Sequence, residues 1–160
     1  MASHFVIDGY NLFFRSCHEK FPFLAKREEF VSFLAEALEM LRFSALLVFD
    51  NNPKHALSYP HRSQRSTLEI VYAPSHLSAD DYILEYLERF YEVKKKPTLI
   101  TSDNELSRKA HLFGVKTLPI SDFFALLHSK HEKRRRMDEK PTGELSRQIE
   151  RYLSIFTKDL

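Results

Sequence analysis

Short apolar runs alternate along the chain with segments in which apolar residues recur at helical spacing. The runs are rich in β-branched and aromatic residues and end at polar or turn-forming positions, which predicts strands at 5–7, 46–49, 68–72, 98–101 and 115–118. The first two are apolar throughout and end at Asp8 and Asp50, a pattern typical of buried parallel strands. We therefore expect a mostly parallel central sheet of about five strands.

Amphipathic helices are predicted between most of these strands. The segment 27–42 has apolar residues at helical spacing, and shorter apolar faces follow at 83–90 and at 106–113, the latter ending before Gly114. Ser121 and Asp122 are expected to cap a helix that continues through Leu127. This order of elements predicts an α/β fold with helices on both faces of the sheet.

The composition changes after His128, where basic residues outnumber acidic ones. We interpret 1–128 as the main domain, 129–141 as an exposed basic connector and 142–160 as a C-terminal amphipathic helix capped by Thr142. The apolar side of that helix consists of Leu145, Ile149, Leu153 and Phe156.

Overall composition narrows the class of protein. With 160 residues, 43% of them hydrophobic, the chain can bury the core of one domain, and a net charge of +2 does not by itself mark a nucleic-acid binder. The single cysteine, Cys17, excludes an intramolecular disulfide framework and is typical of a reducing, cytoplasmic setting. No apolar run approaches the ~18 residues of a membrane span, so we expect no membrane association.

Carboxylates follow the predicted strands. Asp8, Asp50 and Asp103 stand just beyond apolar runs, and Asp80 begins a helix whose inward side carries Ile83. Because the carboxyl ends of parallel strands form one crevice, these carboxylates are expected to converge there. Their repulsion is relieved by a cation, and an all-oxygen ligand set favours Mg²⁺ or Mn²⁺. Such an ion activates water for phosphodiester hydrolysis, with no nucleotide cofactor.

Each carboxylate also has a purely structural interpretation. Asp80 and Asp81 are typical of a helix start with Ser78 as its N-cap, Asp50 is typical of a turn, and Asp103 of a helix cap. Asn11 is expected either to hold a water or phosphate or to cap a turn.

Basic residues are concentrated in the loop expected after the second predicted strand, which ends at Asp50. Lys54, Arg62 and Arg65, with Tyr59 among them, form a candidate track for an RNA backbone, on which the aromatic ring stacks on an unpaired base. The alternative is a solvated loop. The run 134–136, three arginines, is interpreted either as an RNA or ribosome contact or as a solubilising linker.

Four sequence motifs together resemble the YacP-like NYN family over residues 5–127. They are Phe-Val-Ile-Asp-Gly-Tyr-Asn at 5–11, Leu-Val-Phe-Asp at 47–50, Ser-Ala-Asp-Asp-Tyr-Ile at 78–83 and Leu-Ile-Thr-Ser-Asp at 99–103. The resemblance implies a PIN-like three-layer fold and a metal-dependent endoribonuclease, with some relatives acting on mRNA at the ribosome.

By the same resemblance, Asp8, Asp80 and Asp103 match the acidic metal-binding positions, Asn11 the motif asparagine and Asp50 the aspartate that closes the second strand. The resemblance does not carry a role over to Asp81. The segment after Asp50 departs from the glycine-containing form of the family, which leaves the choice of substrate open.

Three hypotheses follow. The first is a cytoplasmic endoribonuclease in which Asp8, Asp80 and Asp103 bind Mg²⁺ or Mn²⁺ while Asp50 and Asn11 orient water or substrate. The second is a non-catalytic RNA- or ribosome-binding adaptor with the same fold. The third, a receiver-like phosphoacceptor, is disfavoured because Asp8 is followed by Gly9 where such domains carry a second acid.

Overall fold

The structure is a computed structural model that describes residues 3–9, 11–12, 23–51, 61–137 and 143–157. Its strands are β1 (His4–Asp8), β2 (Ser44–Phe49), β3 (His61–Arg65), β4 (Leu68–Tyr72), β5 (Thr98–Ile100) and β6 (Lys116–Leu118). Its helices are α2 (Phe23–Leu41), α3 (Ala79–Glu88), α4 (Asn104–His111), α5 (Ile120–Met137) and α6 (Gly143–Thr157). The expected α/β class is confirmed, and α2 begins at Phe23 rather than at Arg27.

One six-stranded sheet runs through the molecule in the order β3-β4-β2-β1-β5-β6. All neighbouring strands are parallel except β3, which is antiparallel to β4. Strand β3 corrects the interpretation of residues 61–65 as part of a loop. Its residues are polar and mostly exposed, so no hydrophobic alternation marks it in the sequence, and its pairing with β4 makes it an edge strand.

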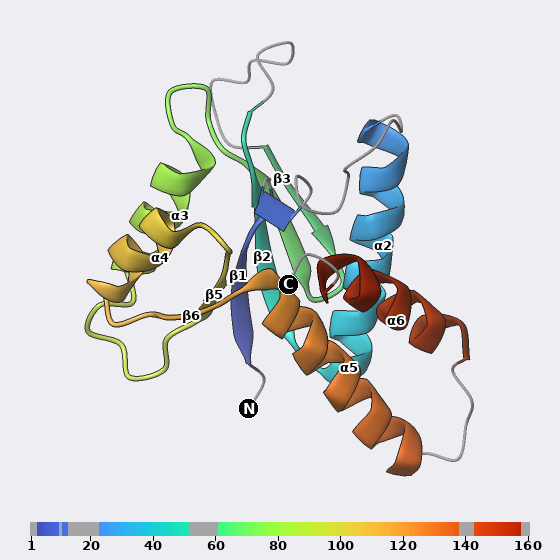
Figure 1. The fold of residues 1–160 in the computed structure, drawn as a ribbon. Coiled ribbons are helices and arrows are strands. Elements are labelled where there is room, and N and C mark those ends of the chain that lie inside the picture. The colour runs from blue at the N-terminus through green and yellow to red at the C-terminus, as the bar shows by residue number, and fades with distance from the viewer. Residues whose placement is uncertain (1–2, 10, 13–22, 52–60, 138–142, 158–160) are drawn as a thin grey trace.

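The two faces of the sheet are covered by different helices (Figure 1). Helices α3 and α4 lie on one face, where Val6, Leu46 and Leu99 of the sheet pack against Ile83 and Leu106. Helices α2, α5 and α6 lie on the other, where alternate strand residues join a second core cluster: Phe5, Ile7, Leu47, Phe49 and Ile100. The strands are therefore buried on both sides, as their continuous apolar sequences predict.

The basic segment after His128 is largely helical. Helix α5 extends to Met137, so residues 129–137 continue the helix instead of forming a connector. Helix α6 packs on α5, and its Leu145 and Ile149 belong to the core cluster that contains α2. The division of the chain at residues 128 and 141 stays a prediction, while Thr142, the expected cap, lies outside the described residues.

Within the described residues, no helix combines the length and the apolar character needed to cross a membrane.

Gly9, directly after Asp8, lies against β2. A Cβ atom at this position lies 2.6 Å from Cδ1 of Phe49 and 2.7 Å from the carbonyl oxygen of Val48, and the backbone atom cannot move without disturbing the strand. We expect Gly9→Ala to lower the free energy of unfolding by about 1 to 3 kcal/mol, measured by urea denaturation.

Gly143→Ala is the matched control, because the nearest atom to its Cβ, Nη2 of Arg147, lies 3.7 Å away. Alanine also favours the helix, so this change leaves stability the same or raises it by up to about 1 kcal/mol. Equal effects of the two substitutions contradict the tight contact at Gly9.

Candidate active site

The carboxyl end of β1 is the point at which the order of strands reverses. The chain leaves β1 through α2 to reach β2 on one side, and later returns through α3 to β5 on the other side. In open α/β sheets this switch point leaves a crevice between the diverging connections, where ligands bind. Asp8 is the last residue of β1, Asp50 follows β2, and Asp103 follows β5 at the start of α4. These three expected site residues therefore share one edge of the sheet, the aspartate edge.

Asp8 is the most buried of these residues, with 3% of its surface exposed. Its Oδ1 accepts a hydrogen bond from the backbone N–H of Asn11 at 3.3 Å, and its Oδ2 accepts one from the Thr101 hydroxyl, also at 3.3 Å. The pKa of Asp8 is raised from 3.8 to about 6, mainly by burial and also by the charges of Asp80 and Asp50, while these two bonds lower it. The site thus holds a carboxylate that is costly to ionise.

Asp50 anchors the start of α3. Its Oδ1 accepts a hydrogen bond of 2.7 Å from the backbone N–H of Ala79, the first residue of that helix. This contact brings Asp80, the next residue, to the aspartate edge. The pKa of Asp80 is raised by desolvation first and then by the charges of Asp103, Asp50 and Asp81, while Lys109 lowers it.

Asp81 has a different position from Asp80. Its backbone N–H donates to Oγ of Ser78 at 3.1 Å, and the Ser78 hydroxyl donates to its Oδ2 at 2.9 Å. This reciprocal pair caps α3, and Asp81 is exposed, so the helix-cap interpretation is confirmed for Asp81. Of the two neighbouring acids, Asp80 is the one that interacts electrostatically with Asp8.

Asp103 is both a helix cap and a member of the aspartate edge. Its Oδ1 accepts from the backbone N–H groups of Glu105 at 2.8 Å and Leu106 at 3.1 Å. Because both cap bonds end on Oδ1, the cap leaves Oδ2 for a ligand. The backbone N–H of Asp103 donates to Oγ1 of Thr101, the same hydroxyl that donates to Asp8.

Asn11 ties the end of β1 to the turn after β5. Its Oδ1 accepts from the backbone N–H of Ser102 at 3.1 Å, and its own N–H donates to Asp8. Ser102 in turn accepts, through Oγ, from the backbone N–H of Ile120, the first residue of α5. Asn11 is therefore a positioning residue of the aspartate edge in this structure.

The donor set consists of oxygen atoms, which suits a hard divalent cation. In the described part of the chain, no three of these aspartates have carboxylate oxygens that all lie within 4.8 Å of one another. A Mg²⁺ ion keeps several of its waters and binds proteins through one or two carboxylates, so this spacing fits an ion held partly through water.

The predicted phosphate-binding residues are only partly described. Lys54 and Tyr59 lie outside the described residues. Arg62 forms an ion pair with Glu69 and donates to the Tyr82 hydroxyl at 2.6 Å, and Arg65 forms an ion pair with Glu28. Both guanidinium groups are thus paired within the protein, and a phosphate has to compete with these surface partners.

Sequence reasoning did not include Lys109 in the site. This residue of α4 forms an ion pair with Glu105 at 2.9 Å, and the charges of Asp81 and Asp80 also raise its pKa. The signal in the sequence was its place on the short amphipathic helix that Asp103 begins. Its interaction with Asp80 and Asp81 depends on how α3 packs on α4, two helices that are separate in the sequence.

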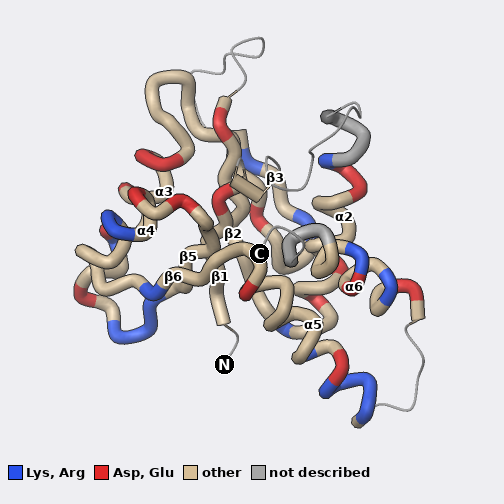
Figure 2. Tube along the Cα trace, in the orientation of Figure 1, with Lys and Arg blue, Asp and Glu red and all other residues tan. Residues whose placement is uncertain are grey.

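The acidic residues of this edge and the arginine run of α5 are separated in space. In Figure 2, red segments lie where α3 and α4 begin, while the blue run of Arg134 to Arg136 lies at the far end of α5.

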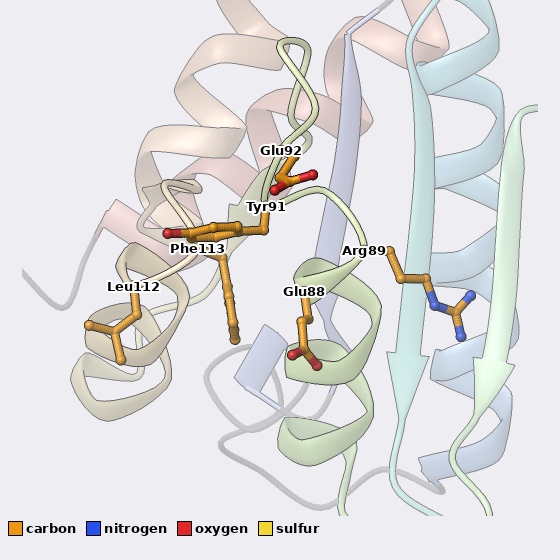
Figure 3. Close-up of a pocket in the computed structure, with 6 residues that line it drawn as sticks. All are labelled: Glu88, Arg89, Tyr91, Glu92, Leu112 and Phe113. Carbon is orange, nitrogen blue, oxygen red and sulfur yellow. The ribbon is translucent and has the colours of Figure 1, made fainter.

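A surface hollow of about 470 Å³ lies away from the aspartate edge, at the C-terminal ends of α3 and α4 (Figure 3). It is lined by Glu88, Arg89, Tyr91, Glu92, Leu112 and Phe113. It does not include the aspartates.

Comparison with known proteins gives one family and one fold. Residues 5–158 match the model of the YacP-like NYN domain. A crystal structure of a mutant of Rae1 (YacP) from Bacillus subtilis is 15% identical, with a TM-score of 0.65 over 94% of this chain and 91% of that chain. A crystal structure of Rae1 (YacP) without that mutation is 18% identical, with a TM-score of 0.57 over 99% and 94% of the two chains. No curated protein matches the chain.

The raised pKa of Asp8 predicts how stability depends on pH. Because the folded-state pKa of about 6 exceeds 3.8, the folded protein binds this proton more tightly, and stability falls as pH rises from about 4 to 6. We expect Asp8→Asn to remove this loss and to be more stable than the original by about 3 kcal/mol at pH 7 without divalent cations.

Urea denaturation in EDTA between pH 4.5 and 7.5 measures this difference. Asp122→Asn, which alters an exposed carboxylate of α5, is the control and should follow the unsubstituted protein. The burial argument fails if the Asp8→Asn and unsubstituted curves run parallel over this range.

Proposed function

We propose that this chain, which belongs to the YacP-like NYN domain family, is an endoribonuclease that uses Mg²⁺ or Mn²⁺ at the aspartate edge. Membership confirms the resemblance carried by the sequence motifs. The family is PIN-like and nuclease-type, is associated with RNA binding or cleavage, and often uses divalent metals. The metal, the cleavage reaction and the roles of individual residues are the proposal.

The observation that carries the proposal is the buried carboxylate of Asp8 facing other carboxylates at the switch point of the sheet. Asp80 and Asp50 both raise its pKa, so the charges interact, and yet among the described residues no lysine or arginine forms an ion pair with Asp8, Asp50 or Asp80. Such an arrangement lowers stability unless a cation binds. A divalent ion supplies that charge.

Each residue has a distinct role in the proposal. Asp8, Asp80 and Asp103 hold the ion, directly or through its waters, and Asp50 fixes Asp80 by anchoring the start of α3. Asn11 keeps Asp8 and the turn after β5 together. When bound, the ion makes water a better nucleophile and stabilises negative charge on the phosphate that is cleaved.

RNA is proposed to approach along the segment 54–65. Arg62 and Arg65 form exposed ion pairs, and such pairs contribute only about 0 to 1 kcal/mol, so a phosphate backbone can replace their carboxylate partners. Lys54 and Tyr59 are proposed to add charge and base stacking. We include mRNA at the ribosome among the substrates because the family resemblance implies it, and we propose a cytoplasmic location because the single cysteine is typical of a reducing setting.

A non-catalytic RNA- or ribosome-binding adaptor is the second candidate. The observation in its favour is that three ligand atoms of the aspartates are not within 4.8 Å of one another in the described residues. Such a protein retains the fold and binds RNA through its basic residues. RNA binding that is sensitive to salt, unaffected by substitution of the aspartates and without cleavage products identifies it.

Cleavage of single-stranded RNA in Mn²⁺ or Mg²⁺ tests the proposal. We expect Asp8→Asn, Asp80→Asn and Asp103→Asn each to lower the cleavage rate at least about 100-fold, because loss of even an outer-shell partner of a metal commonly costs 10- to 100-fold. Product formation is followed on end-labelled RNA, and EDTA should abolish it.

Asp81→Asn is the matched control, since Asp81 neighbours Asp80 but caps α3 and is exposed. It should retain a rate within about threefold of the original, the cap being worth about 1 kcal/mol of stability. If the unsubstituted protein cleaves RNA no faster than Asp8→Asn in either metal, the chain is not this enzyme.

A further inference from the structure

Three side chains with metal-binding atoms meet between α5 and α6, on the far side of the sheet from α3 and α4. His128 and Glu132 stand four residues apart on α5, on one face of the helix, and Glu150 faces them from α6. The ligand atoms of all three lie within 4.8 Å of one another. Since α5 begins at Ile120, near the aspartate edge, His128 lies about 12 Å further along the helix and forms a separate cluster.

Hydrogen bonds do not account for this cluster. Nε2 of His128 is 3.8 Å from Oε1 of Glu150, which is longer than a hydrogen bond. Among the residues that the structure describes, Oε1 of Glu132 is shielded from solvent and has no hydrogen-bond partner, and the cation paired with it, Nη1 of Arg135, is 3.5 Å away. A shielded carboxylate oxygen without a hydrogen bond is costly, and a cation at the cluster removes that cost.

We propose that His128, Glu132 and Glu150 bind a zinc ion that fastens α6 to α5. Zinc takes imidazole nitrogen and carboxylate oxygen at about 2.0 to 2.2 Å in tetrahedral geometry, which places ligand atoms about 3.4 Å apart. The ligand atoms lie within 4.8 Å of one another and therefore have to approach by at most about 1.4 Å. The imidazole favours zinc over the Mg²⁺ proposed for the all-oxygen aspartate edge, and water completes the coordination at this partly exposed position.

The ion links two helices that already touch through apolar contacts. Leu145 and Ile149 of α6 are buried in the core, and the Ser146 hydroxyl lies 3.2 Å from Nδ1 of His131. Glu150 lies one residue after Ile149, at the rim of this contact, with 58% of its side chain exposed. A zinc ion thus joins α5 and α6 at the edge of their apolar contact. It raises the stability of the folded chain, because it binds a site that exists only when the helices are packed.

Thermal unfolding of the EDTA-treated full chain, with and without zinc chloride, tests the proposal. At zinc concentrations about a hundredfold above the dissociation constant, we expect the melting temperature to rise by roughly 5 to 10 °C. We expect His128→Gln and Glu150→Gln each to weaken zinc binding at least about tenfold, measured by titration calorimetry. Both side chains are partly exposed, so the variants should fold, which circular dichroism checks.

His76→Gln and Glu144→Gln are matched controls, because both residues are exposed and lie outside the cluster, and they should keep the full zinc response. Asp8→Asn should keep it too, which separates this site from the aspartate edge and from the proposed nuclease activity. The proposal is overturned if zinc leaves the melting temperature unchanged, or if the response survives in both His128→Gln and Glu150→Gln. In that case, the cluster is only a histidine–glutamate ion pair.

Discussion

The burial of the Asp8 carboxylate is the constraint around which the rest of the site is arranged. With 3% of the residue exposed, Asp8 has lost nearly all of its water and accepts two long hydrogen bonds, from Asn11 and Thr101. Two bonds of 3.3 Å do not replace hydration of a charge, which is why the pKa rises to about 6. Asn11 and Thr101, which donate these bonds, also hold the turn after β5 in place. The free-energy cost of burying the Asp8 charge therefore depends on the geometry of the whole aspartate edge.

Two helix starts lie at the same edge and are held by its other aspartates. Helix α3 begins where Asp50 accepts from Ala79, and α4 begins where Asp103 accepts from Glu105 and Leu106. The N-terminal end of a helix carries a partial positive charge, so both helices favour the anionic edge. The structural and functional interpretations of these aspartates are therefore compatible: the oxygen that caps a helix fixes the carboxylate, and its second oxygen remains for a ligand.

The sequence predicted the parts of the fold that depend on apolar patterns. Strands such as Ser44–Phe49 are buried on both faces, and a continuous apolar run is the direct consequence. Strand His61–Arg65 was missed because an exposed edge strand has no core to mark it, and its pairing with Leu68–Tyr72 comes from backbone hydrogen bonds. The end of α5 was missed for a related reason: its charged last turns carry no apolar stripe, although arginines there suit the negative end of a helix.

Long-range contacts set the limit of prediction at the site. Strand-end positions placed Asp8, Asp50 and Asp103 on one edge, but the bond from Ala79 to Asp50 joins residues 29 positions apart and depends on the packing of α3. The same limit applies to His128, Glu132 and Glu150, of which only the first two are related by helical spacing.

The arginine run of α5 interacts largely with the protein itself, which changes the role that its charge suggests in the sequence. Arg134 donates to the carbonyl oxygen of Met40 at the end of α2, and Arg135 pairs with Glu132. Two of the three guanidinium groups therefore have partners within the protein, and the run lies far from the acidic edge (Figure 2). A polyanion that approaches the aspartates meets negative charge there, and the arginines of α5 are too distant to offset it. In the proposed reaction, a bound cation would reduce this repulsion and so favour the approach of the phosphate as well as its cleavage.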